Sequence, residues 1–116
     1  MLRKSHEMES EIRERMRGGT GQVKITHIFS KNEFKGKIRL MAKITLDKGC
    51  SIGFHRHENE EEIFYILKGT GQIDDNGSIV TVNPGDAILT GDGKGHGVEN
   101  TGTKSLELLA IILLYN

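Results

Sequence analysis

Hydrophobic and polar residues alternate in short runs over most of the chain, beginning near residue 22. In the clearest run, every second residue is apolar: Ile38, Leu40, Ala42, Ile44 and Leu46. This period of two is typical of a β-strand with one buried face. Residues 74–77 and 83–86, which lie between such runs, are rich in the residue types that form tight turns. The pattern predicts an all-β domain of many short strands, either a sandwich or a barrel.

Two further runs, residues 63–67 and 108–114, are apolar at successive positions and do not alternate. Strands of this kind are covered on both faces. In a barrel, one face of each strand points into the core. The other face then needs a cover, either the N-terminal segment or a second subunit. We prefer the second subunit and expect a homodimer.

The first seventeen residues are dense in charge and show a different spacing. Met8, Ile12 and Met16 are four residues apart, which predicts one narrow apolar stripe on a helix. The paired glycines at 18 and 19 favour the end of that helix. We therefore expect an N-terminal helix and turn over residues 1–20, followed by one β-barrel domain over residues 21–116.

Composition narrows the class of partner. The 116 residues carry 16 basic and 16 acidic side chains with no long block of either sign, which argues against a nucleic-acid or membrane partner. The single cysteine, Cys50, cannot form an internal disulfide, and no signal peptide is apparent. The longest apolar run, residues 106–115, is about half the length that spans a membrane. We expect a cytoplasmic protein whose partner is a small molecule.

Three histidines and one glutamate are candidate metal ligands. His55 and His57 lie two residues apart on a predicted strand, so both imidazoles share one face. After a bend, Glu62 lies on the returning strand, where its carboxylate could face the same ion. His96, the only downstream histidine, follows a glycine-rich turn and is the obvious fourth ligand. Two histidines and a carboxylate with open positions are the ligand set of non-haem iron, which manganese also accepts.

Other readings of these residues remain open. A pair of histidines two apart also occurs on exposed edge strands without any metal. Glu60 or Glu61 could replace Glu62 as ligand, although with Glu58 they are more typical of a solvated turn. His6 and His27 are expected to be exposed or structural. The spacing does not decide whether an arginine reaches the site.

These positions resemble the two motifs of the cupin superfamily. The first motif is matched by Gly49, His55, His57, Glu62 and Gly69. The second is matched by Gly85, Gly93, His96 and Asn100, with Gly91 where the family usually has proline. Fifteen residues separate the motifs, a short spacing that resembles compact single-domain members.

The resemblance implies a small antiparallel jelly-roll barrel that binds a divalent metal through His55, His57, Glu62 and His96. Manganese, iron, nickel, copper or zinc would suit these ligands. The chain looks most like small members described as oxalate-decarboxylase-like. This implies a metal-dependent decarboxylase or dioxygenase acting on a small carboxylic acid; the alternatives are a non-catalytic binding protein and a purely structural metal. No proton donor can be placed, because strand parity turns Glu99 outward and Asp92 lies in a turn.

Overall fold

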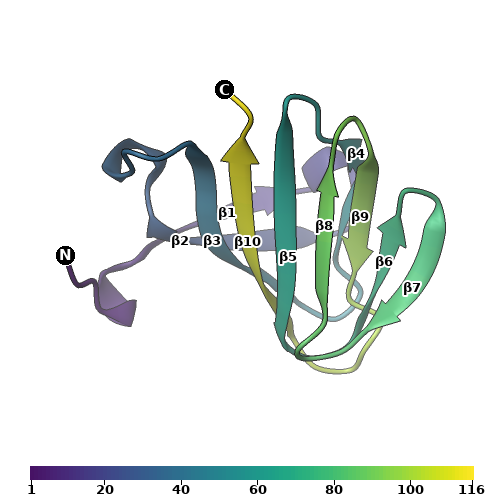
Figure 1. Ribbon diagram of the computed structural model, residues 1–116. Coiled ribbons are helices and arrows are strands. Elements are labelled where there is room, and N and C mark those ends of the chain that lie inside the picture. Colours follow the sequence, from purple (N-terminus) through teal and green to yellow (C-terminus); the bar gives the residue numbers. More distant parts are fainter.

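The computed structural model describes residues 1–116, which form ten strands and three short 3₁₀ turns (Figure 1). The strands are β1 (Glu9–Glu14), β2 (Gln22–Phe29), β3 (Ile38–Leu46), β4 (Ser51–Arg56), β5 (Glu60–Lys68), β6 (Gly71–Asp75), β7 (Ser78–Val82), β8 (Ala87–Gly91), β9 (Gly95–Glu99) and β10 (Leu106–Leu114). The 3₁₀ turns are η1 (Ser5–Glu7), η2 (Met16–Gly18) and η3 (Lys31–Glu33). No helix in the structure is long and apolar enough to span a membrane.

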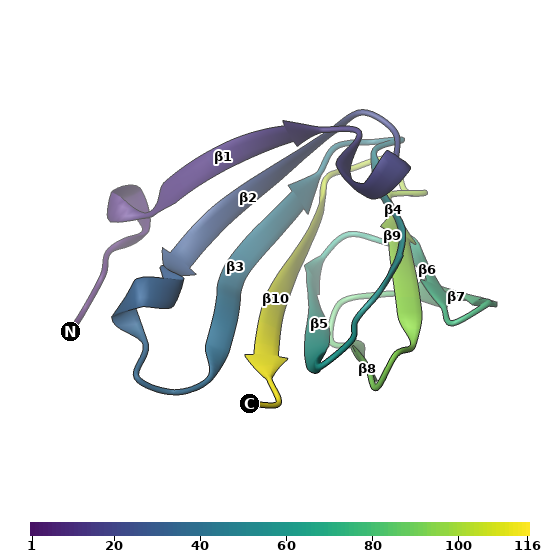
Figure 2. The ribbon, with the colours of Figure 1, turned by 90° about the horizontal axis from the view of Figure 1, so that it is seen from above.

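The strands form two antiparallel sheets. The larger has the order β1-β2-β3-β10-β5-β8 and the smaller has the order β4-β9-β6-β7. From β3 onward the chain passes back and forth between the sheets, with β6 and β7 forming the one hairpin within a sheet. The predicted all-β jelly roll is therefore confirmed, as two facing sheets. In Figure 2, β1 and β2 extend the larger sheet away from β4, β9, β6 and β7.

The hydrophobic core lies between the sheets and follows the alternation of the sequence. Fourteen buried apolar residues form one cluster. On β10 the buried residues are Leu106, Leu108, Ala110 and Ile112, while those between them are only partly buried. One face of the strand is therefore buried in the core, as expected when side chains alternate between the two faces of a strand.

The predicted N-terminal helix is wrong. Residues Glu9–Glu14 form strand β1, which pairs antiparallel with β2 along its whole length. The hydroxyls of Ser10 and Thr26 lie 2.9 Å apart across these strands. The four-residue spacing of apolar side chains is compatible with a helix. However, every second residue of the segment forms backbone hydrogen bonds with the free edge of β2. Tertiary pairing of this kind overrides helical propensity.

The turn after β1 is docked tightly on β4. The backbone N–H of Ser51 donates to the carbonyl of Thr20, and the backbone N–H of Thr20 donates to the hydroxyl of Ser51, both at 2.8 Å. A Cβ atom added to Gly53 would lie 2.0 Å from the carbonyl oxygen of Arg17. Arg17 itself has a left-handed backbone, with φ of 55°. The close approach requires glycine at 53 and places Arg17 beside the strand that carries His55.

The outer face of the larger sheet is uncovered. Tyr65, Leu67 and Leu89 are exposed, Leu89 by 63%. The N-terminal segment does not cover this face, because it extends the sheet sideways as β1 and β2. Of the two covers considered for these apolar strands, the N-terminal segment is therefore excluded.

Candidate metal centre

The four predicted ligands come together inside the molecule. One donor atom from each of His55, His57, Glu62 and His96 lies within 4.8 Å of the others. His55 is on β4, His57 follows β4, His96 is on β9, and Glu62 is on β5 of the other sheet. His57, Glu62 and His96 are at most 4% exposed. The cluster therefore spans the interior between the two sheets.

A β-bulge turns the histidines inward. The pairing of β4 with β9 shifts register between Ile52 and His55, after which His55 pairs directly with His96. A bulge adds one residue to a strand and so reverses which side chains face inward. Ile52 and His55 consequently line the same cavity even though they are three positions apart. Glu62 points inward by ordinary alternation, together with Phe64 and Ile66.

Three of the donor atoms form a compact triangle. The Nε2 atoms of His57 and His96 are 3.1 Å apart, and each lies 2.9 Å from Oε1 of Glu62. Two ligand atoms at right angles around an octahedral ion, each about 2.1 Å from it, are about 3 Å apart. The three separations fit one triangular face of such an octahedron.

The positions of the hydrogen atoms on these groups also favour binding of a cation between them. Nδ1 of His57 lies 2.5 Å from Oε2 of Glu60, and because a carboxylate only accepts, Nδ1 must carry the hydrogen. In the neutral ring Nε2 is then a bare acceptor that faces the carboxylate of Glu62. Two acceptors at 2.9 Å repel each other unless a proton or a metal ion lies between them. The donor set therefore fits a divalent ion.

The pKa shifts follow from the same contacts. Burial acts to lower the pKa of His57, but the hydrogen bonds to Glu62 and Glu60 outweigh it and the pKa is raised. Burial acts to raise the pKa of Glu62, but His57 and His96 outweigh it and the pKa is lowered. In the absence of metal, a proton is therefore favoured on His57. A metal ion bound at Nε2 would replace that proton.

The other two imidazoles are held differently. Nδ1 of His55 donates to the backbone carbonyl of Gly53 at 2.8 Å, and burial lowers the pKa of His55, which favours the neutral form that binds metals. The ring of His96 stacks on Phe64 with centroids 4.4 Å apart and planes 8° apart. Nδ1 of His96 and Oγ1 of Thr90 are buried and make no hydrogen bond within the chain.

A cavity of about 250 Å³ opens above the cluster. Its walls are largely aliphatic: Ile25, Leu40, Ile44, Ile52 and Ile112, with Met16 at the turn. Phe64, Ile66 and Val98 are buried but do not line this cavity. Of the four clustered residues, His55, His57 and Glu62 line the cavity, and its other polar side chains are Arg13, Arg17, Arg39 and His27. Glu62 is the only carboxylate that lines it.

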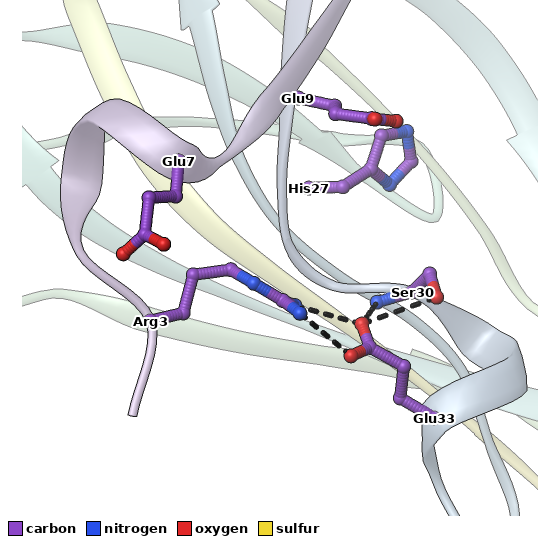
Figure 3. A pocket seen from close by; sticks show the side chains of 6 residues that line it. All are labelled: Arg3, Glu7, Glu9, His27, Ser30 and Glu33. Carbon is purple, nitrogen blue, oxygen red and sulfur yellow. Dashed lines mark hydrogen bonds and ion pairs between the residues drawn. The ribbon is translucent and has the colours of Figure 1, made fainter. Parts of the chain in front are cut away.

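A second hollow of about 200 Å³ lies near the N-terminus (Figure 3). Arg3 makes two hydrogen bonds of 2.7 Å to the carboxylate of Glu33, which ties the N-terminal residues to η3. His27 lines this hollow as well, and its Nε2 lies 2.9 Å from Oε2 of Glu11. No apolar residue lines this hollow and none of the four clustered residues does, whereas the Arg3–Glu33 ion pair at its wall attaches the N-terminal segment.

Glu60 differs from its expected role, and His27 and Arg17 line the cavity. Glu60 is not part of a solvated turn, since it binds both His57 and Arg39. His27, expected to be exposed or structural, lines the cavity. Arg17 reaches the cavity, whereas Arg56 donates to the carbonyl of Gly93 and lies over Phe54, outside it. Only the position of Glu60, three residues after His57 across a bend, could have been noticed in the sequence.

Fold and site together define a small jelly-roll protein with an internal cluster of potential metal ligands. Residues 42–112 match the family model for the cupin domain, and the chain belongs to this family. It is 45% identical over 114 residues to an oxalate-binding protein of Thermotoga maritima, covering 98% of this chain and 94% of the relative.

The comparison with solved structures agrees. A crystal structure described as a predicted oxalate decarboxylase of Thermotoga maritima superposes with a TM-score of 0.94, at 45% identity, over 98% of this chain and 99% of that one. A polyketide cyclase from Streptomyces resistomycificus has a TM-score of 0.79 at 18% identity, over 100% of this chain and 81% of that one. This second likeness shows the fold alone.

Proposed function

We propose that the protein binds a divalent metal ion through His55, His57, Glu62 and His96 and binds a small carboxylic acid such as oxalate at the remaining positions of that ion. The observation that carries the proposal is the triangle of donor atoms, two of whose residues, His57 and Glu62, line a cavity whose other polar side chains are mainly arginines. Manganese, iron, nickel, copper or zinc would suit the donor set. When bound, the ion supplies a Lewis acid that attracts a carboxylate.

The arginines favour an anionic ligand. Arg17 makes no side-chain hydrogen bond in the structure and lines the cavity with its guanidinium available. Arg39 uses Nε and Nη2 to bind Glu60, so its Nη1 remains available. Guanidinium groups bind carboxylates with directed, charge-assisted hydrogen bonds. The aliphatic walls limit water around the ligand and strengthen these interactions.

The cavity favours binding over turnover. Decarboxylation needs a proton donor that reaches the substrate, and Glu62, the only carboxylate in the cavity, is one of the proposed metal ligands. The relative described as an oxalate-binding protein is consistent with a binding role. Turnover as a decarboxylase or dioxygenase is the second candidate. It is favoured by His27, an imidazole in the same cavity that is hydrogen-bonded to Glu11.

Calorimetry with oxalate tests the proposal. We expect oxalate to bind the manganese-loaded protein and not the metal-free protein, and formate to bind more weakly because it has one carboxylate. Release of carbon dioxide and uptake of oxygen, followed in the same samples, separate binding from turnover. Oxalate binding of equal strength with and without metal would contradict the proposed site.

We also retain the homodimer as a proposal. The outer face of the larger sheet exposes Tyr65, Leu67 and Leu89, and Ile63 pairs with both Leu89 and Ile111 across the strands. Burying such a contiguous apolar face against its own copy would remove it from water. Light scattering should give a dimer that Leu89→Lys weakens. Ile79→Lys, at an equally exposed position on the other sheet, is the control. A monomeric wild-type protein would contradict the proposal.

The cytoplasmic location likewise remains a proposal. It is supported by the half-buried single cysteine, Cys50, which forms no disulfide. Fractionation of the source cells with an antibody against the protein tests it, and recovery outside the cytoplasmic fraction would contradict it.

A further inference from the structure

Glu60 holds one of the three clustered imidazoles by its outer nitrogen. Oε2 of Glu60 lies 2.5 Å from Nδ1 of His57, and the Glu60 side chain is only 14% exposed. The carboxylate accepts, so the hydrogen of His57 must be on Nδ1. This leaves the lone pair of Nε2 directed at Glu62 and His96.

Arg39 holds Glu60 in turn. Nε of Arg39 lies 3.0 Å from Oε1 of Glu60, and Nη2 lies 2.9 Å from Oε2. Two parallel hydrogen bonds fix the plane of the carboxylate as well as its position. The positive charge of the guanidinium therefore lies directly against this carboxylate. The acceptor that faces His57 is therefore a fixed anion.

His57 differs from the other two imidazoles in this respect. The Nδ1 atom of His55 is held by the backbone carbonyl of Gly53, which no side-chain substitution removes. Nδ1 of His96 has no hydrogen-bond partner in the chain, and its ring is held by stacking on Phe64. Only His57 has its Nδ1 held by a side chain.

We propose that Arg39 and Glu60 are a positioning pair that holds His57 with its hydrogen on Nδ1 and its Nε2 toward the metal ion. The inference rests on the metal centre proposed above and assigns roles to two residues outside it. A carboxylate on the far nitrogen of a metal-binding histidine fixes the ring and raises its basicity, and its loss typically weakens metal binding about 10-fold to 100-fold.

Two measurements on the full chain test the pair. The first is the dissociation constant of Mn²⁺, from the electron paramagnetic resonance signal of the free ion, repeated with Zn²⁺ by competition with a chelator. We expect Glu60→Ala to raise the dissociation constants of both ions about 10-fold to 100-fold. Glu60→Gln should lose less metal affinity, because its amide oxygen still accepts a hydrogen bond from Nδ1. The metal affinity of Arg39→Gln should lie between those of the wild type and Glu60→Ala. The control is Glu58→Ala, which removes an exposed neighbouring carboxylate and should leave both dissociation constants unchanged.

The second measurement needs no metal. Long-range ¹H–¹⁵N spectra of the metal-free protein, at a pH where the ring is neutral, report which nitrogen of His57 carries the hydrogen. We expect Nδ1 in the wild type and in Glu60→Gln, and a mixture of both forms in Glu60→Ala. A wild-type hydrogen on Nε2, or unchanged metal affinity in Glu60→Ala, would overturn the inference. If the wild type bound neither ion, the proposed metal centre would fail and the spectrum alone would decide the positioning. If Glu60→Ala failed to fold, Arg39→Gln and Glu60→Gln would carry the same comparison.

Discussion

Nε2 of His57 lies 2.9 Å from Oε1 of Glu62, although the two residues belong to opposite halves of the jelly roll. His57 follows β4 in the smaller sheet, and Glu62 is on β5 in the larger sheet. A metal ion bound to both would connect the two sheets directly. Binding at this position would therefore stabilise the whole fold as well as the site.

The first prediction concerns this connection. An ion that binds the folded chain and not the unfolded chain should stabilise the fold by about 2.7 kcal/mol when its free concentration is 100 times its dissociation constant. Denaturant unfolding at increasing Mn²⁺ measures the effect. The double variant His55→Ala, His96→Ala should show no dependence on Mn²⁺, and a wild type without such dependence would argue against an ion that links the sheets.

The second prediction concerns Arg17. Arg17→Gln removes an unpaired cation from the cavity and should raise the dissociation constant for oxalate about threefold to tenfold in the metal-loaded protein, less at high salt. Arg56→Gln is a matched control, because Arg56 is bound to the carbonyl of Gly93 outside the cavity. Titration calorimetry of both variants checks the expectation. Equal losses in the two variants would show that only overall charge matters.

The third prediction concerns Gly53. In Gly53→Ala the new methyl group would lie 2.0 Å from the carbonyl oxygen of Arg17, so the docked turn must move. We expect a loss of about 1–3 kcal/mol in the free energy of unfolding, because overpacking forces the backbone to shift. Oxalate affinity should fall with it. Gly36→Ala, where a Cβ would meet nothing within 4 Å, should leave both nearly unchanged. Wild-type stability in Gly53→Ala would contradict the tight docking.

The fourth prediction concerns pH. Arg3 holds the pKa of Glu33 at about 2, below its ordinary value of 4.5. Because the folded pKa is the lower one, the ion pair contributes fully above pH 4.5, and this contribution is lost as the pH falls toward 2. Carboxyl titration by nuclear magnetic resonance should find the low pKa. Hydrogen exchange at the amide of Glu7, which closes η1, should quicken in Glu33→Gln. An ordinary pKa for Glu33 would show that the N-terminal segment is held otherwise.

The sequence predicted the cluster of His55, His57, Glu62 and His96 because the placement of these residues depends mainly on local geometry. Strand alternation places His55 and His57 on one face, and it turns Glu62 inward and Glu99 outward, as the buried and exposed residues confirm. The bulge between Ile52 and His55 could not be predicted, because it depends on the pairing of β4 with β9. It is the bulge that brings His55 opposite His96.

The rest of the cavity depends on contacts between distant parts of the chain. Arg17 and His27 reach it because β1 and β2 extend the larger sheet and the turn η2 docks on β4. The same edge pairing made the helical pattern of residues 1–17 misleading, since a strand with a free neighbour can form from a sequence that also suits a helix. The spacing of residues in the sequence therefore could not predict that Arg17 and His27 line the cavity.

The central claim is that His55, His57, Glu62 and His96 hold a metal ion. Its most direct test is metal analysis of protein purified without a histidine tag or added metal, for the wild type and for the double variant His55→Ala, His96→Ala. We predict a near-stoichiometric divalent ion in the wild type that is lost in the double variant. No metal in the wild type, or the same amount in both proteins, would contradict the claim.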